Sequence, residues 1–304
     1  MTRKGSAPVG FADGDFLQPL ARYFAGGYLF HYTSVAGLLG IAKSKSLWAS
    51  HALYMNDPQE ILHAYQLLVK VVAGLKRSAR TDERRHVLTH FGRWVACLDG
   101  TLPIFVFCLT EAGDSLNHWR LYTPSRKGVA IGLPVEVLKS AAARAGFRLV
   151  KCVYESKSQR IVLREMVNSI VEKADVHAAM KLTDEDSRVL PYHGFFESHL
   201  CDIATVMASL KMDHFSDERE WRLVSQCNRR HQMPDDVQFR LGASLLLPYV
   251  EISLKEELDK HEGSLLLGCD PELDPLARDA LFAFAINSKL VGLMRDSLVP
   301  LKRY

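Results

Sequence analysis

Residues 103–110, PIFVFCLT, predict the buried strand around which the rest of the fold is interpreted. The run is continuously apolar and is bounded by Pro103 and Glu111. A strand with apolar side chains on both faces needs cover on both faces. Strand-like runs recur along the chain, at residues 26–32, 46–50, 127–134, 146–154, 220–226, 245–253 and 264–268. Helical runs alternate with them, so the sequence predicts a mixed α/β or α+β domain.

Helical periodicity is expected at residues 33–45, 58–75, 82–98, 113–122, 159–211 and 275–290. Thr33 or Ser34 is available as the N-cap of the first of these helices, and Asp114 is expected to cap the short helix that ends at Tyr122. The two longest helical stretches, near residues 57–99 and 159–211, are interpreted as insertions between core strands. We therefore expect an N-terminal lead over residues 1–27 and a single elaborated domain over residues 28–304.

Composition narrows the class of protein without selecting a ligand. The chain has 304 residues, 48% of them hydrophobic, and 38 basic against 35 acidic residues give a net charge of +3. This near balance favours neither nucleic acid nor a membrane surface as a partner. Six cysteines without a CxxC pair favour a reducing compartment. With no apolar segment long enough to cross a bilayer, we expect a cytoplasmic protein without a membrane partner.

The stretch FSDEREWRLV, residues 215–224, is the first candidate site. On a strand, period-2 alternation places Glu218, Glu220 and Arg222 on one face, and Trp221 and Leu223 on the other. One interpretation is a solvated sheet face with cross-strand ion pairs. The other is a pair of carboxylates held on a rigid strand to stabilise a cation that develops during reaction, as in glycosidic cleavage.

The stretch LFHYTS, residues 29–34, raises a similar choice. His31 is either a core histidine or the first contact of a binding site. His31 and Thr33 share one face of the predicted strand, so an imidazole and a hydroxyl can address the same polyhydroxylated ligand.

In YMNDPQE, residues 54–60, a helix start explains part of the motif. Asp57 suits the N-cap, Pro58 the first helical position, and Glu60 the return contact of a capping box. Tyr54 and Asn56 are not explained by the cap. An aromatic ring there either packs within the protein or stacks on a heteroaromatic ligand.

Other reaction classes have weaker or no support. Cys108, Asn117 and His118 suggest a cysteine hydrolase, but Cys108 falls inside the buried strand and no glycine-rich elbow precedes it. Trp119 and Tyr122 are expected in the core. P-loop, GxGxxG, HExxH and EF-hand patterns are absent from the sequence, which removes support for kinases, dehydrogenases and zinc proteases.

Five ordered stretches carry a resemblance that spans residue 28 to the C-terminus. They are LFHYTSVAGLLGI, LYMNDPQE, FCLTEAGDSLNHWRLY, KGVAIGL and FSDEREWRLV. In this order they resemble a bacterial family of unknown function that occurs among abortive-infection and phage-defence genes. Members of that family are similar to ADP-ribosyltransferases, which cleave NAD at the nicotinamide-ribose bond. The resemblance implies an α+β fold of split antiparallel sheets with large helical insertions, and NAD as the substrate.

The resemblance also implies roles for individual residues. In the stretch HYT, His31 would bind a ribose hydroxyl, Thr33 would support the pocket, and the backbone of Tyr32 would hold the nicotinamide carboxamide. In the stretch ERE, Glu220 would hold the ribose 2′-hydroxyl and stabilise the oxocarbenium, while Glu218 would orient the acceptor.

An aromatic residue packs on the nicotinamide ring in those enzymes. The resemblance implies Tyr54 for that role, with Trp48 as its substitute.

Three functions follow as hypotheses. The first is a toxin or phage-defence effector that transfers ADP-ribose to a macromolecular acceptor, protein or nucleic acid, under a neutralising or activating partner. The second is a non-catalytic sensor of the same fold that binds nucleotide or nucleic acid. The third is a metal-dependent nuclease built on the acidic side chains of the two motifs, Asp57, Glu60, Glu218 and Glu220.

Overall fold

The computed structural model describes residues 27–55, 59–98, 104–123, 128–181, 192–226, 236–242, 245–260, 265–271 and 273–299. The expected helix cap at Asp57 and Pro58, the neighbouring Asn56, and the N-terminal lead before Gly27 lie outside these ranges. In the part of the chain that is described, no helix combines the length and apolar character that crossing a bilayer requires.

The fold is built on one ten-stranded sheet, and the predicted mixed α+β class is confirmed. The strands are β1 (Tyr28–Ser34), β2 (Ser46–His51), β3 (Phe105–Thr110), β4 (Gly128–Pro134), β5 (Phe147–Lys151), β6 (Glu220–Ser225), β7 (Gln238–Leu241), β8 (Leu246–Ser253), β9 (Leu265–Cys269) and β10 (Val291–Asp296). Pairs between them are antiparallel except for β9 with β10, which run parallel.

The sheet forks at β3. One edge of β3 pairs with β6 over the five residues from Val106 to Thr110. Its other edge pairs with β2 through Phe105 and Val106, and with β1 through Thr110. Cys108 lies between those two contacts and pairs with Arg222 of β6. From the fork, one arm continues as β1–β4–β9–β10 and the other as β2–β8–β7, with β5 beyond β6. The expected split sheets are therefore one continuous, forked sheet, and its likeness to ADP-ribosyltransferases stays a prediction.

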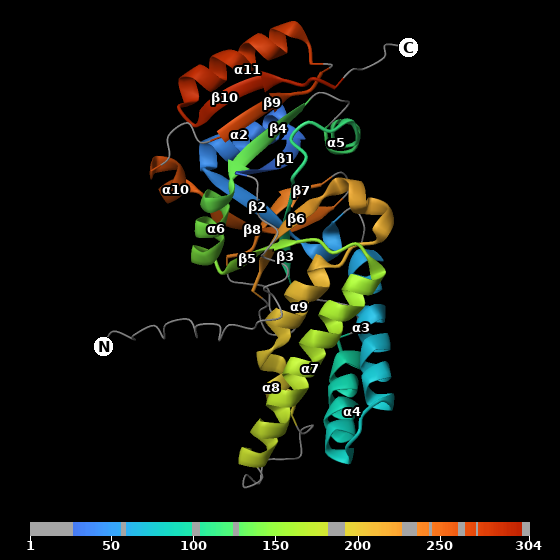
Figure 1. The fold of residues 1–304 in the computed structure, drawn as a ribbon. Helices are drawn as coiled ribbons and strands as arrows, with labels where there is room; N and C mark the ends of the chain where they lie inside the picture. Colours follow the sequence, from blue (N-terminus) through green and yellow to red (C-terminus); the bar gives the residue numbers. More distant parts are fainter. Residues whose placement is uncertain are drawn as a thin grey trace, which may run out of the picture.

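A bundle of helices packs through one end against one face of the central strands and extends away from the sheet (Figure 1), and we call this bundle the helical layer. It consists of α3 (Gln59–Arg77), α4 (Asp82–Ala96), α7 (Ser156–Lys181), α8 (His193–Ser198) and α9 (Leu200–Ser209). These helices occupy the two stretches that the sequence suggested as insertions, between β2 and β3 and between β5 and β6. They pack together in a core that includes Phe91, Leu163 and Ile203 and that reaches the sheet at Val106 and Val224.

A second core lies on the other face of β3, between the two arms of the sheet. It joins Leu29 of β1, Leu47 of β2, Phe107 of β3 and Ile252 of β8. Smaller helices border the sheet, namely α2 (Val35–Ser44), α5 (Leu116–Tyr122), α6 (Val135–Arg144), α10 (Lys255–Lys260) and α11 (Pro275–Ser288). Because successive residues of a strand face opposite ways, β3 supplies side chains to both cores, as its continuous apolar run predicts.

Two predicted helix caps have different outcomes. Ser34 caps α2, since its hydroxyl accepts a hydrogen bond from the Gly37 amide at 3.0 Å. The predicted cap at Asp114 is wrong, because α5 begins after Ser115. Asp114 instead accepts bonds from the Trp119 indole at 2.8 Å and from the Leu298 amide at 2.7 Å. Its carboxylate thereby connects α5 to the segment that follows β10.

The helical core predicts unequal effects of two truncations on the same helix. Leu163 on α7 is fully buried, whereas Ile161 is 46% exposed. Leu163→Ala is expected to lower the free energy of unfolding by about 2–5 kcal/mol, because it leaves a cavity. Ile161→Ala is expected to change it by less than about 1 kcal/mol. Urea unfolding of both variants checks this, and equal losses would contradict the assignment of this core.

Candidate active site around Lys211

Glu220 and Arg222 lie on the face of β6 that the helical layer covers. Residues directly opposite in an antiparallel ladder share a face. Glu220 is opposite Thr110 and Arg222 is opposite Cys108, whose side chain packs against the helical core. The period-2 pattern of the sequence therefore places these two charged residues correctly.

Glu218 reaches the same site by a different route. It is the last residue of a 3-10 turn, η4 (Asp213–Glu218), not part of the strand. Arg219 then adopts a left-handed conformation, with φ of 42°, before β6 begins. This conformation is uncommon for a residue other than glycine. The turn, not strand alternation, directs the Glu218 carboxylate toward Glu220.

Three carboxylates converge on the ammonium group of Lys211, which follows α9 in the chain. Lys211 Nζ lies 2.5 Å from Glu218 Oε2, 2.5 Å from Glu220 Oε2 and 3.2 Å from Glu60 Oε1. Glu60 comes from the first turn of α3. From the sequence, a helix cap was a sufficient explanation of Glu60, yet its side chain is buried and ion-paired.

Arg222 completes the arrangement, which we name the Lys211 cluster: Glu60, Lys211, Glu218, Glu220 and Arg222. Arg222 donates from Nε to Glu220 Oε1 at 2.7 Å and from Nη2 to Glu60 Oε2 at 2.5 Å. Its Nη1 donates to the Ala208 carbonyl at 2.8 Å. With all five groups ionised, three negative charges face two positive ones, so the cluster carries a formal charge of −1.

The opposite charges keep Glu220 and Lys211 ionised. Burial raises the pKa of Glu220, but the charges and hydrogen bonds of Arg222 and Lys211 outweigh burial and lower that pKa to about 2. Burial lowers the pKa of Lys211, but Glu220 and Glu60 outweigh burial and raise it. At neutral pH the site therefore holds fixed charges.

Two tyrosines border the cluster. The Tyr122 hydroxyl, on α5, donates a hydrogen bond to Glu218 Oε1, with 2.7 Å between the two oxygens. The prediction that Tyr122 is a core residue is wrong, because it is 37% exposed, whereas Trp119 is buried as predicted. Tyr154, which follows β5, accepts the Glu220 backbone N–H at 2.8 Å. Tyr122 is thus at the rim of the cluster and Tyr154 at its base.

Cys108 contacts the cluster without the properties of a nucleophile. Burial raises the pKa of its thiol well above the ordinary value, and Glu220 raises it further. A reactive cysteine needs the opposite shift, toward thiolate. The structure therefore agrees with the argument against a cysteine hydrolase.

His31 lies on the other side of β3 from Glu220. Its ring packs on Phe107, with 4.4 Å between the ring centroids, and Phe107 faces away from Cys108 and the cluster. Its Nδ1 is 3.0 Å from the Cys108 carbonyl, at the fork. Because a carbonyl only accepts, this nitrogen carries the proton. The structure thus does not bring His31 and Glu220 into one cleft.

Tyr32 and Thr33 have structural neighbours of their own. The Tyr32 phenol is buried, donates to the Ala112 carbonyl at 2.7 Å and accepts the Ser115 amide at 3.0 Å. Thr33 lies against α2, where a Cβ built on Gly37 would come within 2.2 Å of Thr33 Oγ1. This close approach explains the glycine and holds the end of β1 against the helix.

The two aromatic candidates lie in or just after β2. Tyr54 is in a 3-10 turn, η2 (Ala52–Tyr54), where it is 44% exposed and meets the His51 ring edge-on at 5.5 Å. Trp48 stacks on Tyr249 at 4.5 Å. Both rings belong to the β2–β8–β7 arm of the sheet, whereas His31, Tyr32 and Thr33 belong to the other arm.

The cluster gives no support to a metal-dependent nuclease. Glu60, Glu218 and Glu220 do converge, but Lys211 Nζ occupies the position among them that a divalent cation would need. Asp57 lies outside the described residues. Within the described ranges, no group of three or more His, Cys, Asp or Glu side chains is arranged to hold a metal ion.

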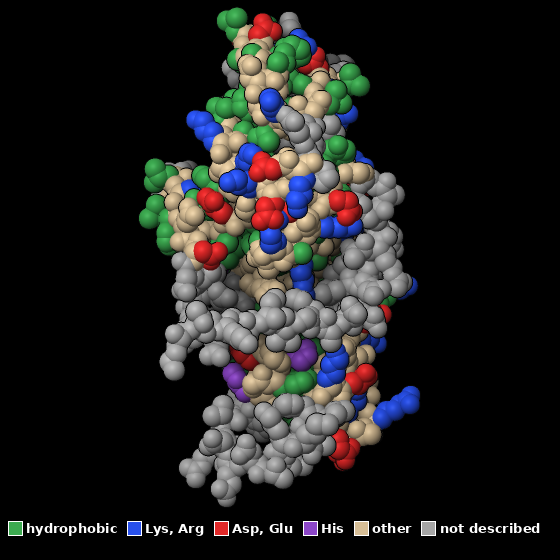
Figure 2. All heavy atoms as spheres, turned by 90° about the vertical axis from the view of Figure 1, so that its left-hand side faces the viewer, with side chains coloured by type: hydrophobic (Ala, Val, Ile, Leu, Met, Phe, Trp, Pro, Cys, Tyr) green, Lys and Arg blue, Asp and Glu red, His purple; other side chains and the backbone are tan. Residues whose placement is uncertain are grey.

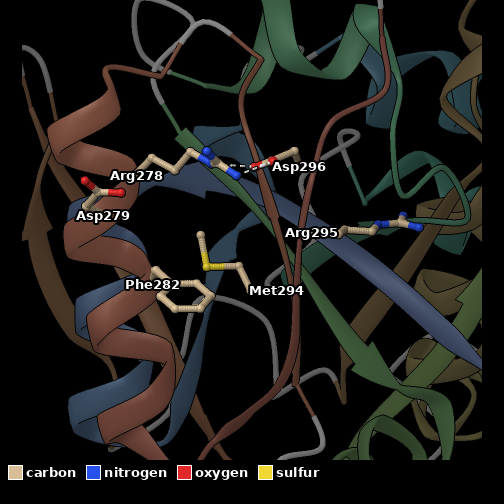
Figure 3. A pocket seen from close by; sticks show the side chains of 6 residues that line it. All are labelled: Arg278, Asp279, Phe282, Met294, Arg295 and Asp296. Carbon is tan, nitrogen blue, oxygen red and sulfur yellow. Dashed lines mark hydrogen bonds and ion pairs between the residues drawn. The ribbon is translucent and has the colours of Figure 1, made fainter.

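An open pocket of about 350 Å³ lies elsewhere, between α11 and β10 (Figure 3). Its lining consists of Arg278, Asp279, Phe282, Met294, Arg295 and Asp296. Figure 3 shows Arg278 turned toward Asp296, and Arg278 Nε donates to Asp296 Oδ1 at 2.8 Å. No residue of the Lys211 cluster lines this pocket. We place the candidate site at the cluster because perturbed, buried ionisable groups are concentrated there.

Comparison with protein families gives a match over part of the chain. The model of a family described as a protein of unknown function, DUF2971, matches residues 118–223. The matched segment includes Tyr122, Lys211, Glu218, Glu220 and Arg222, and ends just inside β6. The match confirms a family of unknown function over these residues, but it does not extend to the HYT stretch and it supports neither the phage-defence context nor the likeness to ADP-ribosyltransferases. No curated protein and no solved structure matches the chain.

We expect the loss of Lys211 to lower the free energy of unfolding far more than the loss of a partly exposed lysine with a similar partner, Lys151. Lys211→Met leaves two buried carboxylates and the partly buried Glu218 with one cation, and is expected to lower the free energy of unfolding by about 3–5 kcal/mol. Lys151→Met removes an ion pair with Glu111 that is about one third exposed, and is expected to cost less than about 1 kcal/mol. Urea unfolding at pH 7 compares them. Similar small losses would contradict a buried, fully paired Lys211.

The fork predicts a pH dependence that belongs to His31. Burial lowers the pKa of His31 from 6.5 to about 4. The unfolded chain therefore binds this proton more readily, so the stabilising contribution is complete above pH 6.5 and is lost as the pH falls toward 4. Between these values the stability of His31→Gln is expected to fall less steeply than that of the wild type. Urea midpoints measured across this range check it, and parallel curves would contradict the burial of a neutral His31.

Proposed function

We propose that the protein cleaves NAD at the nicotinamide-ribose bond and transfers ADP-ribose to an acceptor, with Glu220 and Glu218 as catalytic residues. The observation that carries the proposal is the Lys211 cluster, in which two fixed carboxylates adjoin a partly exposed rim. Cleavage of this bond develops an oxocarbenium-like cation on the ribose, which a preorganised anion stabilises. The formal charge of −1 on the cluster is of the required sign.

The two glutamates are suited to different tasks. The Glu220 side chain is held by Arg222 and Lys211 and is nearly enclosed. The Glu218 side chain is 13% exposed and lies beside Tyr122. In this proposal Glu218 is the carboxylate nearer the incoming acceptor, and Glu220 supplies the fixed charge that faces the ribose.

The backbone of Tyr32 supports a place for the nicotinamide. The Asp270 N–H donates to the Gly128 carbonyl, so the backbone N–H and C=O of Gly128 face β9. Because these groups alternate along a strand, the N–H and C=O of Ala130, two residues later, also face β9. Tyr32 is opposite Ala130, and its own amide and carbonyl consequently point away from β4, toward the fork. A neighbouring N–H and C=O match the acceptor and donor of a carboxamide.

A non-catalytic nucleotide sensor is the second candidate, and two observations favour it. Both oxygens of Glu220 are already bonded, to Arg222 and to Lys211. His31 lies on the opposite face of β3, away from the carboxylates. A protein with this arrangement binds NAD or a related nucleotide at the fork without turning it over.

The biological setting is also a proposal. We propose a cytoplasmic toxin or phage-defence effector, held in check by a neutralising or activating partner, since unrestrained NAD cleavage would harm the host cell. Thiols outside any disulfide at Cys97, Cys108 and Cys152 are in keeping with a reducing compartment. Figure 2 shows basic and acidic side chains intermingled on the described part of one face, which favours neither a protein nor a nucleic-acid acceptor.

Nicotinamide release from NAD tests the proposed reaction. Wild-type protein, with cell lysate as a source of acceptor, is expected to release nicotinamide. Glu220→Gln and Glu218→Gln are each expected to lower the rate of release by at least about 10²-fold, because one fixed charge near the reacting carbon is lost. Chromatography of the reaction mixture measures the product.

Glu111→Gln is the matched control. Glu111 is also paired with a lysine, Lys151, but it bonds the indole of Trp221 and lies outside the Lys211 cluster. We expect this variant to retain the wild-type rate. Circular dichroism establishes that each variant is folded. Equal rates in wild type and a folded Glu220→Gln would contradict the proposal, and NAD binding without release would select the sensor.

A further inference from the structure

Tyr122 and Glu218 have the geometry of a nucleophile and its general base. The Tyr122 Oη lies 2.7 Å from Glu218 Oε1 and donates its proton to that oxygen. A nucleophilic hydroxyl and its base are found within about 2.6–3.2 Å of each other. Tyr122 is 37% exposed, so a substrate at the rim can reach the phenol.

A third group fixes the base. Glu218 Oε2 is 2.5 Å from Lys211 Nζ, which leaves Oε1 directed at Tyr122. Tyr122 is thus bonded to its base, Glu218, and Glu218 is held in turn by Lys211, which is the arrangement found around other activated hydroxyls. Burial raises the pKa of the Tyr122 phenol, and the Glu218 carboxylate raises it further. The phenol is therefore protonated at neutral pH and needs a base before it reacts.

The other two tyrosines near the site are engaged differently. The Tyr32 phenol donates to the Ala112 carbonyl, and the Tyr154 hydroxyl accepts the Glu220 amide at 2.8 Å. Of these three tyrosines, Tyr122 is the one whose hydroxyl is bonded to a carboxylate.

We propose that Tyr122 is itself an acceptor of ADP-ribose, so that the protein modifies its own rim; this inference rests on the proposed NAD cleavage. Tyr122 Oη forms a bond to C1′ of the nicotinamide ribose while the bond from C1′ to the nicotinamide nitrogen breaks. Nicotinamide leaves as a neutral molecule with the electron pair of that bond. The phenolic proton passes to Glu218. The products are nicotinamide, a proton and ADP-ribose joined to Tyr122 Oη by an O-glycosidic bond.

Such a modification would limit the enzyme. The attached ADP-ribose replaces the phenolic hydrogen bond to Glu218 and occupies the partly exposed rim through which the next substrate reaches the carboxylates. We therefore expect self-modification to reach about one ADP-ribose per chain and the rate of nicotinamide release to fall as it proceeds.

The test follows nicotinamide and protein-bound label in one experiment. Full-length protein is incubated with NAD carrying a radiolabel in the adenosine, nicotinamide release is measured, and the label is located by proteolysis and mass spectrometry. The expected result is label on the peptide that contains Tyr122, with at least tenfold less in Tyr122→Phe. Tyr249→Phe is the control, since the Tyr249 hydroxyl donates to Gln238, not to a carboxylate, and we expect it to keep the label.

Chemistry of the bond gives an independent measurement. An O-glycosidic bond to a phenol survives neutral hydroxylamine, whereas an ester formed on Glu218 is cleaved by it. Label that hydroxylamine removes, or nicotinamide release with no label on Tyr122, would overturn this inference and leave the proposed NAD cleavage standing. If wild-type protein releases no nicotinamide at all, both proposals fail.

Discussion

The ammonium group of Lys211, placed among Glu60, Glu218 and Glu220, is the interaction on which the arrangement of the molecule depends. These groups come from the end of α9, the start of α3, the turn before β6 and β6 itself. Charges withdrawn from water must be paired, so the four segments are required to meet. A buried ionic cluster is nonetheless weak evidence for stability, because apolar replacements of the same volume are often neutral or better. The place of the cluster in the proposed function therefore rests on the geometry of its carboxylates and not on their contribution to stability.

The fork of the sheet gives that cluster its surroundings. β3 leaves one backbone carbonyl, that of Cys108, between the strands that pair with its outer edge, and the imidazole of His31 satisfies it. The same strand separates two cores, so His31 faces the core between the arms and Glu220 faces the helical layer. The resemblance to ADP-ribosyltransferases implied that both residues face one ligand. In the proposed function the ligand at the fork is therefore assigned to the Tyr32 backbone and not to the His31 ring.

Sequence periodicity predicted the features that depend on neighbouring residues in the chain. The apolar run of β3 and the shared face of Glu220 and Arg222 follow from strand alternation. The site itself depends on residues that meet only through the fold. Lys211 follows the apolar helix α9 and had no local signal, and Glu60 was already explained as a cap. Glu218 arrives through a left-handed Arg219, which no residue type announces. Strand β7 was missed because all four of its residues are exposed, so it lacks the alternation by which strands are identified.

The most direct test is a crystal structure of Glu220→Gln, which is expected to slow turnover, with NAD bound. We predict the nicotinamide carboxamide against the Tyr32 backbone at the fork, and the attached ribose within hydrogen-bond distance of the side chain at position 220. NAD bound instead in the pocket between α11 and β10, or on the β2–β8–β7 arm without contact to the Lys211 cluster, would contradict it.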